Sequence, residues 1–252
     1  MNAPRFLMMM AVLLAGCASS GNDGQGSSQR VRDIASAHTE LAAAYFESKQ
    51  FAVALQELGV ALQADPNYAP AYNLRGLLRM ELHEDEQAEA DFRKSLKLDA
   101  TSSEAHNNFG WFLCQRGRAG ESIAQFQEAL KNPLYATPEV AYANAGLCSI
   151  EAGDLAQGES FLQRALIMRP DMPQALQGLA ELNYRRGNFT VAKNYLGHLL
   201  ATTPDLSAEQ LWLAARIEHE VGDTEAEASY IVQLIKRFPD SPQAKLARGG
   251  AR

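Results

Sequence analysis

Small residues recur at a nearly constant interval along this chain, each inside a stretch whose apolar positions follow a helical period. In the first such stretch Leu41, Ala42 and Tyr45 share one helical face, and Ala54 and Leu58 share a face in the next. The recurring small residues are Ala42, Gly76, Gly110, Gly146, Ala180 and Ala214 or Ala215, with successive gaps of 34, 34, 36, 34 and 34 or 35 residues. A repeated unit of this length predicts an array of stacked helix pairs, each of which buries its apolar face against its neighbours.

Glycine and proline mark the ends of the helices within this period. Glycines stand where the two helices of a unit turn, and prolines follow the second helix, which they cannot continue. They are Gly117, Gly153, Gly187 and Gly222, and Pro66, Pro170, Pro204 and Pro239. Two helices and a turn in about 34 residues is the tetratricopeptide period. The sequence therefore predicts an all-α fold, a right-handed superhelical solenoid of six tetratricopeptide repeats.

The boundaries of the six repeats follow from the same register. They are expected at residues 35–68, 69–102, 103–138 with a longer connection at its end, 139–172, 173–207 and 208–241. The remaining residues, 242–252, are too few for a seventh repeat, and they are either a short polar helix or a frayed tail.

The first 16 residues have the composition of a signal peptide rather than of a repeat. An apolar run from Phe6 to Ala15 is shorter than the roughly 20 residues that a transmembrane helix needs. It ends in Leu14-Ala15-Gly16-Cys17, the pattern of bacterial lipoproteins, in which the cysteine thiol receives the lipid; an ordinary secretory signal with a coincidental cysteine is the alternative. We expect lipid attachment at Cys17 and a flexible polar tether at 17–34. Because Ala18 follows the cysteine, we expect delivery to the outer membrane, facing the periplasm.

Charge and motif content argue against several classes of function. The formal net charge is −7, which disfavours nucleic acid as a partner because such a partner requires a basic face. The five histidines are scattered, and the sequence has no glycine-rich phosphate loop, no GxSxG motif and no SxxK motif. With one of the three cysteines assigned to lipid, no zinc site is available. We therefore expect a protein that is not an enzyme and has no cofactor, no metal and no small-molecule substrate.

A binding surface is the functional feature that the repeats predict. In a solenoid of stacked helix pairs, one helix of each pair lines an extended concave face. Aromatic and aliphatic side chains at those positions predict a groove for a hydrophobic peptide or strand. The candidates are Phe46, Leu77, Asn107, Trp111, Leu147, Tyr184 and Trp212. For each of them, a place in the core between repeats is the alternative.

Two cysteines fall within the predicted repeats. Cys114 and Cys148 lie late in the first helices of adjacent repeats, two residues out of register. Neighbouring first helices pack side by side, so that a Cα separation of about 5.5–6 Å is within reach of a disulfide. The spacing leaves two possibilities open, a disulfide or a pair of buried free thiols that pack as small hydrophobic side chains.

The middle of the chain resembles a known family. The run Asn107-Asn108-Phe109-Gly110-Trp111-Phe112-Leu113-Cys114, the run Pro133-Leu134-Tyr135-Ala136-Thr137-Pro138 and the later Gly146-Leu147-Cys148 carry the resemblance, together with the lipobox and the repeats. They resemble the PilF/PilW type IV pilus biogenesis lipoproteins. The resemblance is specific within residues 106–148, whereas the rest matches tetratricopeptide proteins in general.

The resemblance implies a function and a set of partners. Members of the family act as pilotins, which bind the outer-membrane secretin of the type IV pilus system and help it to reach the membrane and form its multimeric ring, supporting pilus formation and twitching motility. Some members have a disulfide between the third and fourth repeats, and Cys114 and Cys148 match its places. A general outer-membrane scaffold for peptidoglycan enzymes or outer-membrane assembly factors is the alternative function.

Overall fold

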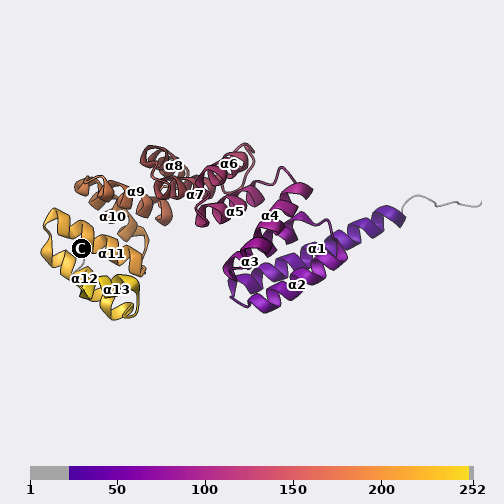
Figure 1. The fold of residues 1–252 in the computed structure, drawn as a ribbon, viewed down its shortest axis with the longest axis horizontal. Coiled ribbons are helices and arrows are strands. Elements are labelled where there is room, and N and C mark those ends of the chain that lie inside the picture. The colour runs from indigo at the N-terminus through magenta and orange to yellow at the C-terminus, as the bar shows by residue number, and fades with distance from the viewer. Residues whose placement is uncertain (1–22, 250–252) are drawn as a thin grey trace, which may run out of the picture.

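The computed structural model describes residues 23–249 of the chain, and within this range helices are the only regular secondary structure (Figure 1). Its helices are α1 (Asp23–Glu47), α2 (Phe51–Ala64), α3 (Ala69–Glu81), α4 (Asp85–Leu98), α5 (Ser103–Gln115), α6 (Ala119–Ala129), α7 (Pro138–Glu151), α8 (Leu155–Met168), α9 (Pro173–Arg185), α10 (Phe189–Thr202), α11 (Ala208–Val221), α12 (Thr224–Arg237) and α13 (Pro242–Arg248). The first twelve form six pairs in the predicted register. Within the described residues, no helix is both long and apolar enough to span a membrane.

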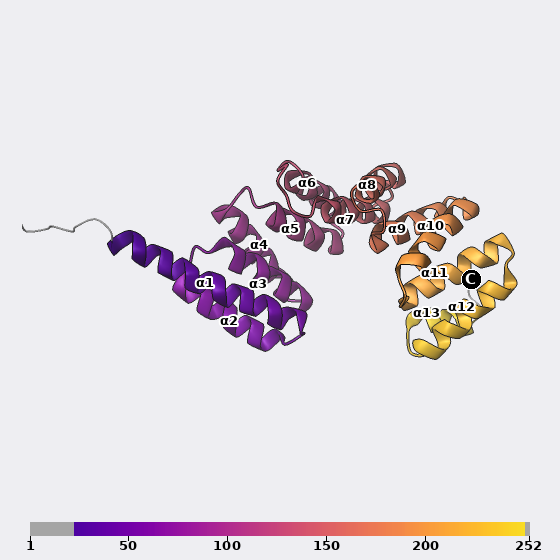
Figure 2. The same cartoon turned by 180° about the vertical axis from the view of Figure 1, so that it is seen from behind.

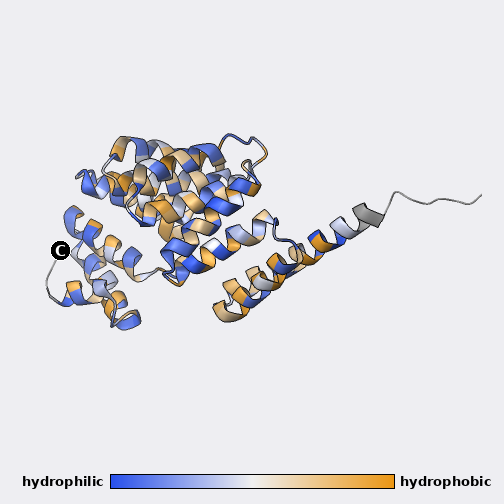
Figure 3. Cartoon of the chain, turned by 45° about the vertical axis from the view of Figure 1, so that its right-hand side comes forward, coloured by the Kyte–Doolittle hydropathy of each residue, from blue (hydrophilic) through white to orange (hydrophobic). Residues whose placement is uncertain are grey.

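The six pairs follow one another along an arch, with α1 at one end and α13 at the other (Figures 1 and 2). Hydrophobic and hydrophilic residues alternate along the helices (Figure 3), as expected for helices that bury one face against their neighbours. The predicted all-α tetratricopeptide superhelix is confirmed.

A small residue in the first helix of each pair makes room for a large residue 16 positions later in the second helix. A Cβ atom added to Gly110 would lie 2.8 Å from the ring of Phe126, and one added to Gly76 would lie 2.9 Å from the ring of Phe92. Both rings are completely buried. The recurring glycine therefore serves close packing between the two helices, which explains why the repeat is visible in the sequence at this position.

The turns inside the repeats require a left-handed backbone. Gly117, Gly153, Gly187 and Gly222 have φ between 71° and 88°, a region that glycine occupies without steric cost. In the first two repeats Lys49 and His83 hold the same place, with φ of 58° and 60°. The predicted turn glycines are confirmed, while the two non-glycine residues carry no sequence signal for this conformation.

The ends of the chain differ in part from the expectation. The tether predicted at 17–34 is wrong from Asp23 onward, because α1 begins there and continues without a break into the first repeat. A packed helix extends easily into polar flanking sequence, and the side chain of Gln29 supports the extension by a 2.7 Å hydrogen bond to Asp33, one turn later. The signal peptide and Cys17 lie outside the described residues.

The C-terminal tail is a helix rather than a frayed end. Helix α13 begins with Ser241 as its N-cap, whose hydroxyl accepts a 3.1 Å hydrogen bond from the amide of Ala244. Ala244 is completely buried against α11 and α12. The helix therefore covers the open face of the sixth repeat, as a capping element must in a solenoid.

Ion pairs connect consecutive repeats on the surface. Arg118 donates hydrogen bonds to Glu89 of the preceding repeat (2.8 Å) and to Glu121 of its own (2.7 Å). The hydrogen bond from Arg118 lowers the pKa of Glu89, against the opposing effect of desolvation. A carboxyl group whose pKa is lower in the folded state stabilises the fold above its unfolded-state pKa, and this contribution is lost as the pH falls through the folded-state value.

Candidate binding groove

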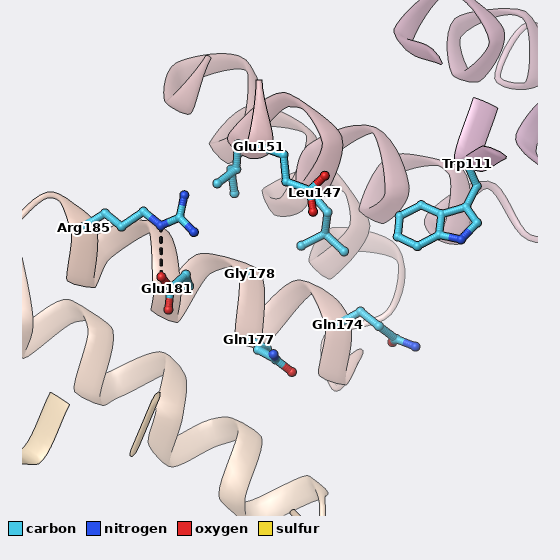
Figure 4. Close-up of a pocket in the computed structure, with 9 residues that line it drawn as sticks. Trp111, Leu147, Glu151, Gln174, Gln177, Gly178, Glu181 and Arg185 are labelled. Atoms are coloured by element: carbon cyan, nitrogen blue, oxygen red, sulfur yellow. Dashed lines mark hydrogen bonds and ion pairs between the residues drawn. The ribbon is translucent and has the colours of Figure 1, made fainter. Parts of the chain in front are cut away.

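A mainly apolar hollow lies on the first helices of the third, fourth and fifth repeats (Figure 4). It has a volume of about 300 Å³. Trp111 of α5 forms one wall, and Leu147 and Ile150 of α7 form another. The Trp111–Leu147 hollow, as we call it, joins two of the predicted groove residues, which lie 36 positions apart in the sequence.

Polar residues of α9 form the opposite side of the Trp111–Leu147 hollow. Gln174 and Gln177 lie at one end, and Glu181 and Arg185 lie at the other (Figure 4). The Nε atom of Arg185 donates a 3.0 Å hydrogen bond to Glu181, which also pairs with the guanidinium of Arg216 at 2.9 Å. The carboxylate of Glu181 is thereby neutralised by two arginines.

A glycine allows α7 and α9 to approach closely at the hollow. A Cβ atom on Gly178 would lie 2.9 Å from a methyl group of Leu147 and 2.8 Å from one of Leu162. Because Leu162 is completely buried, it has no space into which to move. Gly178 thus sets the position of Leu147 in the wall of the hollow.

The other apolar candidates are each half-buried, and the structure does not bring them into this hollow. Leu77 lines a second hollow, of about 250 Å³, between the first and third repeats. Phe46 packs on Phe51 with ring centroids 5.7 Å apart. Tyr184 packs on Phe189 at 5.6 Å and lies under the guanidinium of Arg216. Trp212 packs against the apolar cluster of the sixth repeat and α13.

Asn107 is nearly buried, with 6% of its surface exposed, and it borders a separate hollow of about 720 Å³ between α5 and the connection that precedes α7. Its Oδ1 atom accepts a 3.1 Å hydrogen bond from Asn144, and its Nδ2 atom donates one of 3.3 Å to Asn108. Asn108 in turn donates to Asn73 at 3.3 Å. These amides connect α3, α5 and α7 in one hydrogen-bonded row, so we assign Asn107 to holding first helices together.

The two cysteines of the repeats meet across α5 and α7. Cys114 and Cys148 have their Cα atoms 5.7 Å apart and are paired as a disulfide, a Cα separation in the usual range for that bond. Both are buried, with 5% and 1% exposed, and they pack with Phe126 and Ala145. The pair joins the two helices that carry Trp111 and Leu147.

We expect Cys114 and Cys148 to be linked in the protein isolated from cells. Mass spectrometry without reduction should recover their two peptides as one species. A crosslink over 34 residues contributes about 3–4 kcal/mol by chain-entropy estimates, so reduction should lower the melting temperature. The helical circular dichroism signal should persist below that temperature, since the other repeat interfaces remain. Thiols that alkylate at both positions in unreduced protein would contradict the disulfide.

Several lining residues of the Trp111–Leu147 hollow were not among the predicted candidates. Glu181 lies 34 residues after Leu147, in the same place within the repeat, and Arg185 lies 34 residues after Glu151. The repeat register points to these polar residues, whereas apolar character does not. Gly178 carries no such signal, since its role appears only in the contact with Leu147.

The repeats and their groove define the class of protein. Tetratricopeptide-repeat family models match residues 69–102 and 149–217. The chain is therefore a tetratricopeptide-repeat protein, a class that binds other proteins on its concave face.

Comparison over the whole length places the chain within this class. The type IV pilus assembly protein PilF of Pseudomonas aeruginosa is 28% identical over 93% of both chains. The crystal structure of PilW, a widely conserved type IV pilus biogenesis factor, is 32% identical, with a TM-score of 0.78 over 84% of this chain and 97% of that one. A structure of Pseudomonas aeruginosa PilF has a TM-score of 0.77 and 25% identity, over 89% and 99%. The chain belongs to the PilF/PilW family of type IV pilus biogenesis factors.

Proposed function

We propose that this protein is a pilotin, which binds the secretin of a type IV pilus system, promotes the outer-membrane localisation of that secretin and promotes its assembly into a multimeric ring. Pilus formation and twitching motility depend on that ring. The observation that carries the proposal is the family relationship, which extends over nearly the whole chain rather than over a few repeats.

The surface of the first helices supports a role in binding an extended protein segment. The Trp111–Leu147 hollow and the hollow at Leu77 lie along this surface, and each has both apolar and polar walls. Interfaces concentrate binding energy in a few aromatic and aliphatic anchors that fill such hollows. A protein partner suits this surface better than a small molecule does, because the hollows are spread over several repeats.

We propose further that the protein is anchored in the outer membrane by lipid at Cys17, with the repeats in the periplasm. Substituting Cys17→Ser removes the acceptor thiol, and we expect the variant to leave the outer-membrane fraction and to appear as soluble or unprocessed protein. Each buried methylene contributes about 0.8 kcal/mol to membrane affinity, so the loss of two or three acyl chains should be visible in simple fractionation. A Cys17→Ser variant that still fractionates with the outer membrane would exclude this anchor.

Affinity purification tests the secretin as partner. Full-length protein with a C-terminal tag, purified from detergent-solubilised outer membranes, should bring the secretin with it, identified by mass spectrometry. The matched control is the same purification from a strain without the tag. Recovery of peptidoglycan enzymes or outer-membrane assembly factors without secretin would contradict the pilotin function and favour a general scaffold.

A further inference from the structure

One carboxylate at the Trp111–Leu147 hollow has no cationic partner in residues 23–249. Glu151 is the last residue of α7 and lies at the edge of the hollow (Figure 4). It is exposed and forms no ion pair with any residue that the structure describes. Glu181, by contrast, is held by Arg185 and Arg216. The Oε2 atom of Glu151 lies 3.7 Å from Sγ of Cys114, and the hollow thus combines an apolar wall with a carboxylate that has no ion pair among the described residues.

Most repeats have an acidic residue at the position equivalent to Glu151. The residues at this place are Glu47, Glu81, Gln115, Glu151, Arg185 and Glu220, spaced by 34, 34, 36, 34 and 35 residues. The four glutamates are exposed and, among the described residues, form no ion pair. The single basic member, Arg185, is already paired with Glu181. The C-terminal ends of the first helices therefore carry a net negative charge, and among these glutamates Glu151 lines the Trp111–Leu147 hollow.

This acidic place is locally unfavourable for the helices themselves. All four glutamates lie in the last turn of their helix, as Glu47 does at the end of α1 and Glu151 at the end of α7. The helix dipole is negative there, so an anion at that end is disfavoured. Sequences break a local rule of this kind most often at functional sites. A cation from a partner would relieve the repulsion.

We propose that the Trp111–Leu147 hollow receives one large apolar side chain from a partner segment that carries lysine or arginine within two residues of it. The apolar side chain lies against Trp111, Leu147 and Ile150, and the cation pairs with Glu151. The side-chain amide of Gln174, at the other end of the hollow, is in a position to bond the backbone of the segment. The inference deepens the proposed function and rests on it for the identity of the partner, but its chemistry is testable without the secretin.

Selection of peptides from a random library tests this chemistry. The probe is a phage-displayed library of random dodecapeptides, bound to detergent-solubilised full-length protein. We expect enriched peptides to place a large apolar residue within two positions of lysine or arginine. In a Trp212→Phe variant, which leaves Trp111 as the only tryptophan, a synthetic copy of an enriched peptide should shift the fluorescence emission.

A charge reversal supplies the decisive comparison. Glu151→Lys should weaken binding of the enriched peptide about tenfold, which corresponds to about 1.4 kcal/mol, and replacing the basic residue of the peptide by glutamate should restore binding to that variant. Asp240→Lys is the matched control, because it changes the net charge equally at an exposed turn before α13; it should leave binding unchanged.

Other outcomes would overturn the inference. These are enriched peptides without the apolar–basic pair, equal binding by Glu151→Lys and wild-type protein, or an unchanged emission of Trp111. None of them bears on whether secretin is recovered in the affinity purification. Conversely, a purification without secretin, alongside a successful peptide selection, counts against the pilotin function alone.

Discussion

Replacing Phe126 by alanine is expected to lower the free energy of unfolding by about 3–5 kcal/mol, the usual cost of emptying a fully buried aromatic site. The ring is completely buried between α5 and α6 and contacts the cluster around Cys114 and Cys148. Gly110 cannot fill the void, since it has no side chain. Thermal and urea denaturation followed by circular dichroism measure the effect.

The matched control is Phe161→Ala, in the next repeat. Phe161 is only half-buried and lies at the edge of the same cluster, so truncation leaves a site open to water and should cost markedly less. Equal losses of stability for Phe126→Ala and Phe161→Ala would contradict the packing described for α5 and α6.

A double substitution at Gly110 and Phe126 tests the same packing more stringently. Other repeats combine alanine with leucine where this one combines glycine with phenylalanine, as in Ala42 with Leu58 and Ala180 with Leu196. Gly110→Ala alone should destabilise by about 1–3 kcal/mol, because its Cβ meets the Phe126 ring. The double variant Gly110→Ala, Phe126→Leu should be more stable than the sum of the single effects predicts, as contacting residues are generally coupled.

The fold could be predicted from the sequence because the two helices of each repeat pack against each other in the same way. Close packing of the two helices needs a glycine or alanine in the first helix and a large residue 16 positions later. Both residues can be recognised in the amino-acid sequence. The turn glycines are visible for the same reason. The start of α1 was missed because composition describes a segment alone, whereas Asp23 to Ile34 is helical as an extension of a packed helix.

The candidate site was predictable only in part. Trp111 and Leu147 were found because apolar residues on a first helix stand out. Asn107 does not line this hollow, and its nearly buried amide is hydrogen-bonded to Asn108 and Asn144; in the sequence such an amide looks the same as one that faces a partner. The polar side of the hollow depends on which repeats come together, and periodicity alone does not rank one exposed glutamate above another.

Deleting the gene is expected to have the largest effect on the cell. If the protein is the pilotin proposed above, the secretin of the deletion strain should not reach the outer membrane efficiently, so its heat-stable multimers should be nearly absent and the cells should have few pili and little twitching motility. The wild-type gene in trans should restore all three. The Phe126→Ala variant, if it accumulates to the wild-type level, should restore them in proportion to the fraction that remains folded.

The amount of heat-stable secretin multimer in the outer membrane is the measurement that tests the central claim most directly. It is read by immunoblotting of outer-membrane fractions heated in detergent, from wild-type, deletion and complemented strains with equal total secretin. The pilotin function predicts that the multimer band is lost on deletion and returns on complementation. A deletion strain with an unchanged multimer band and normal twitching would contradict it.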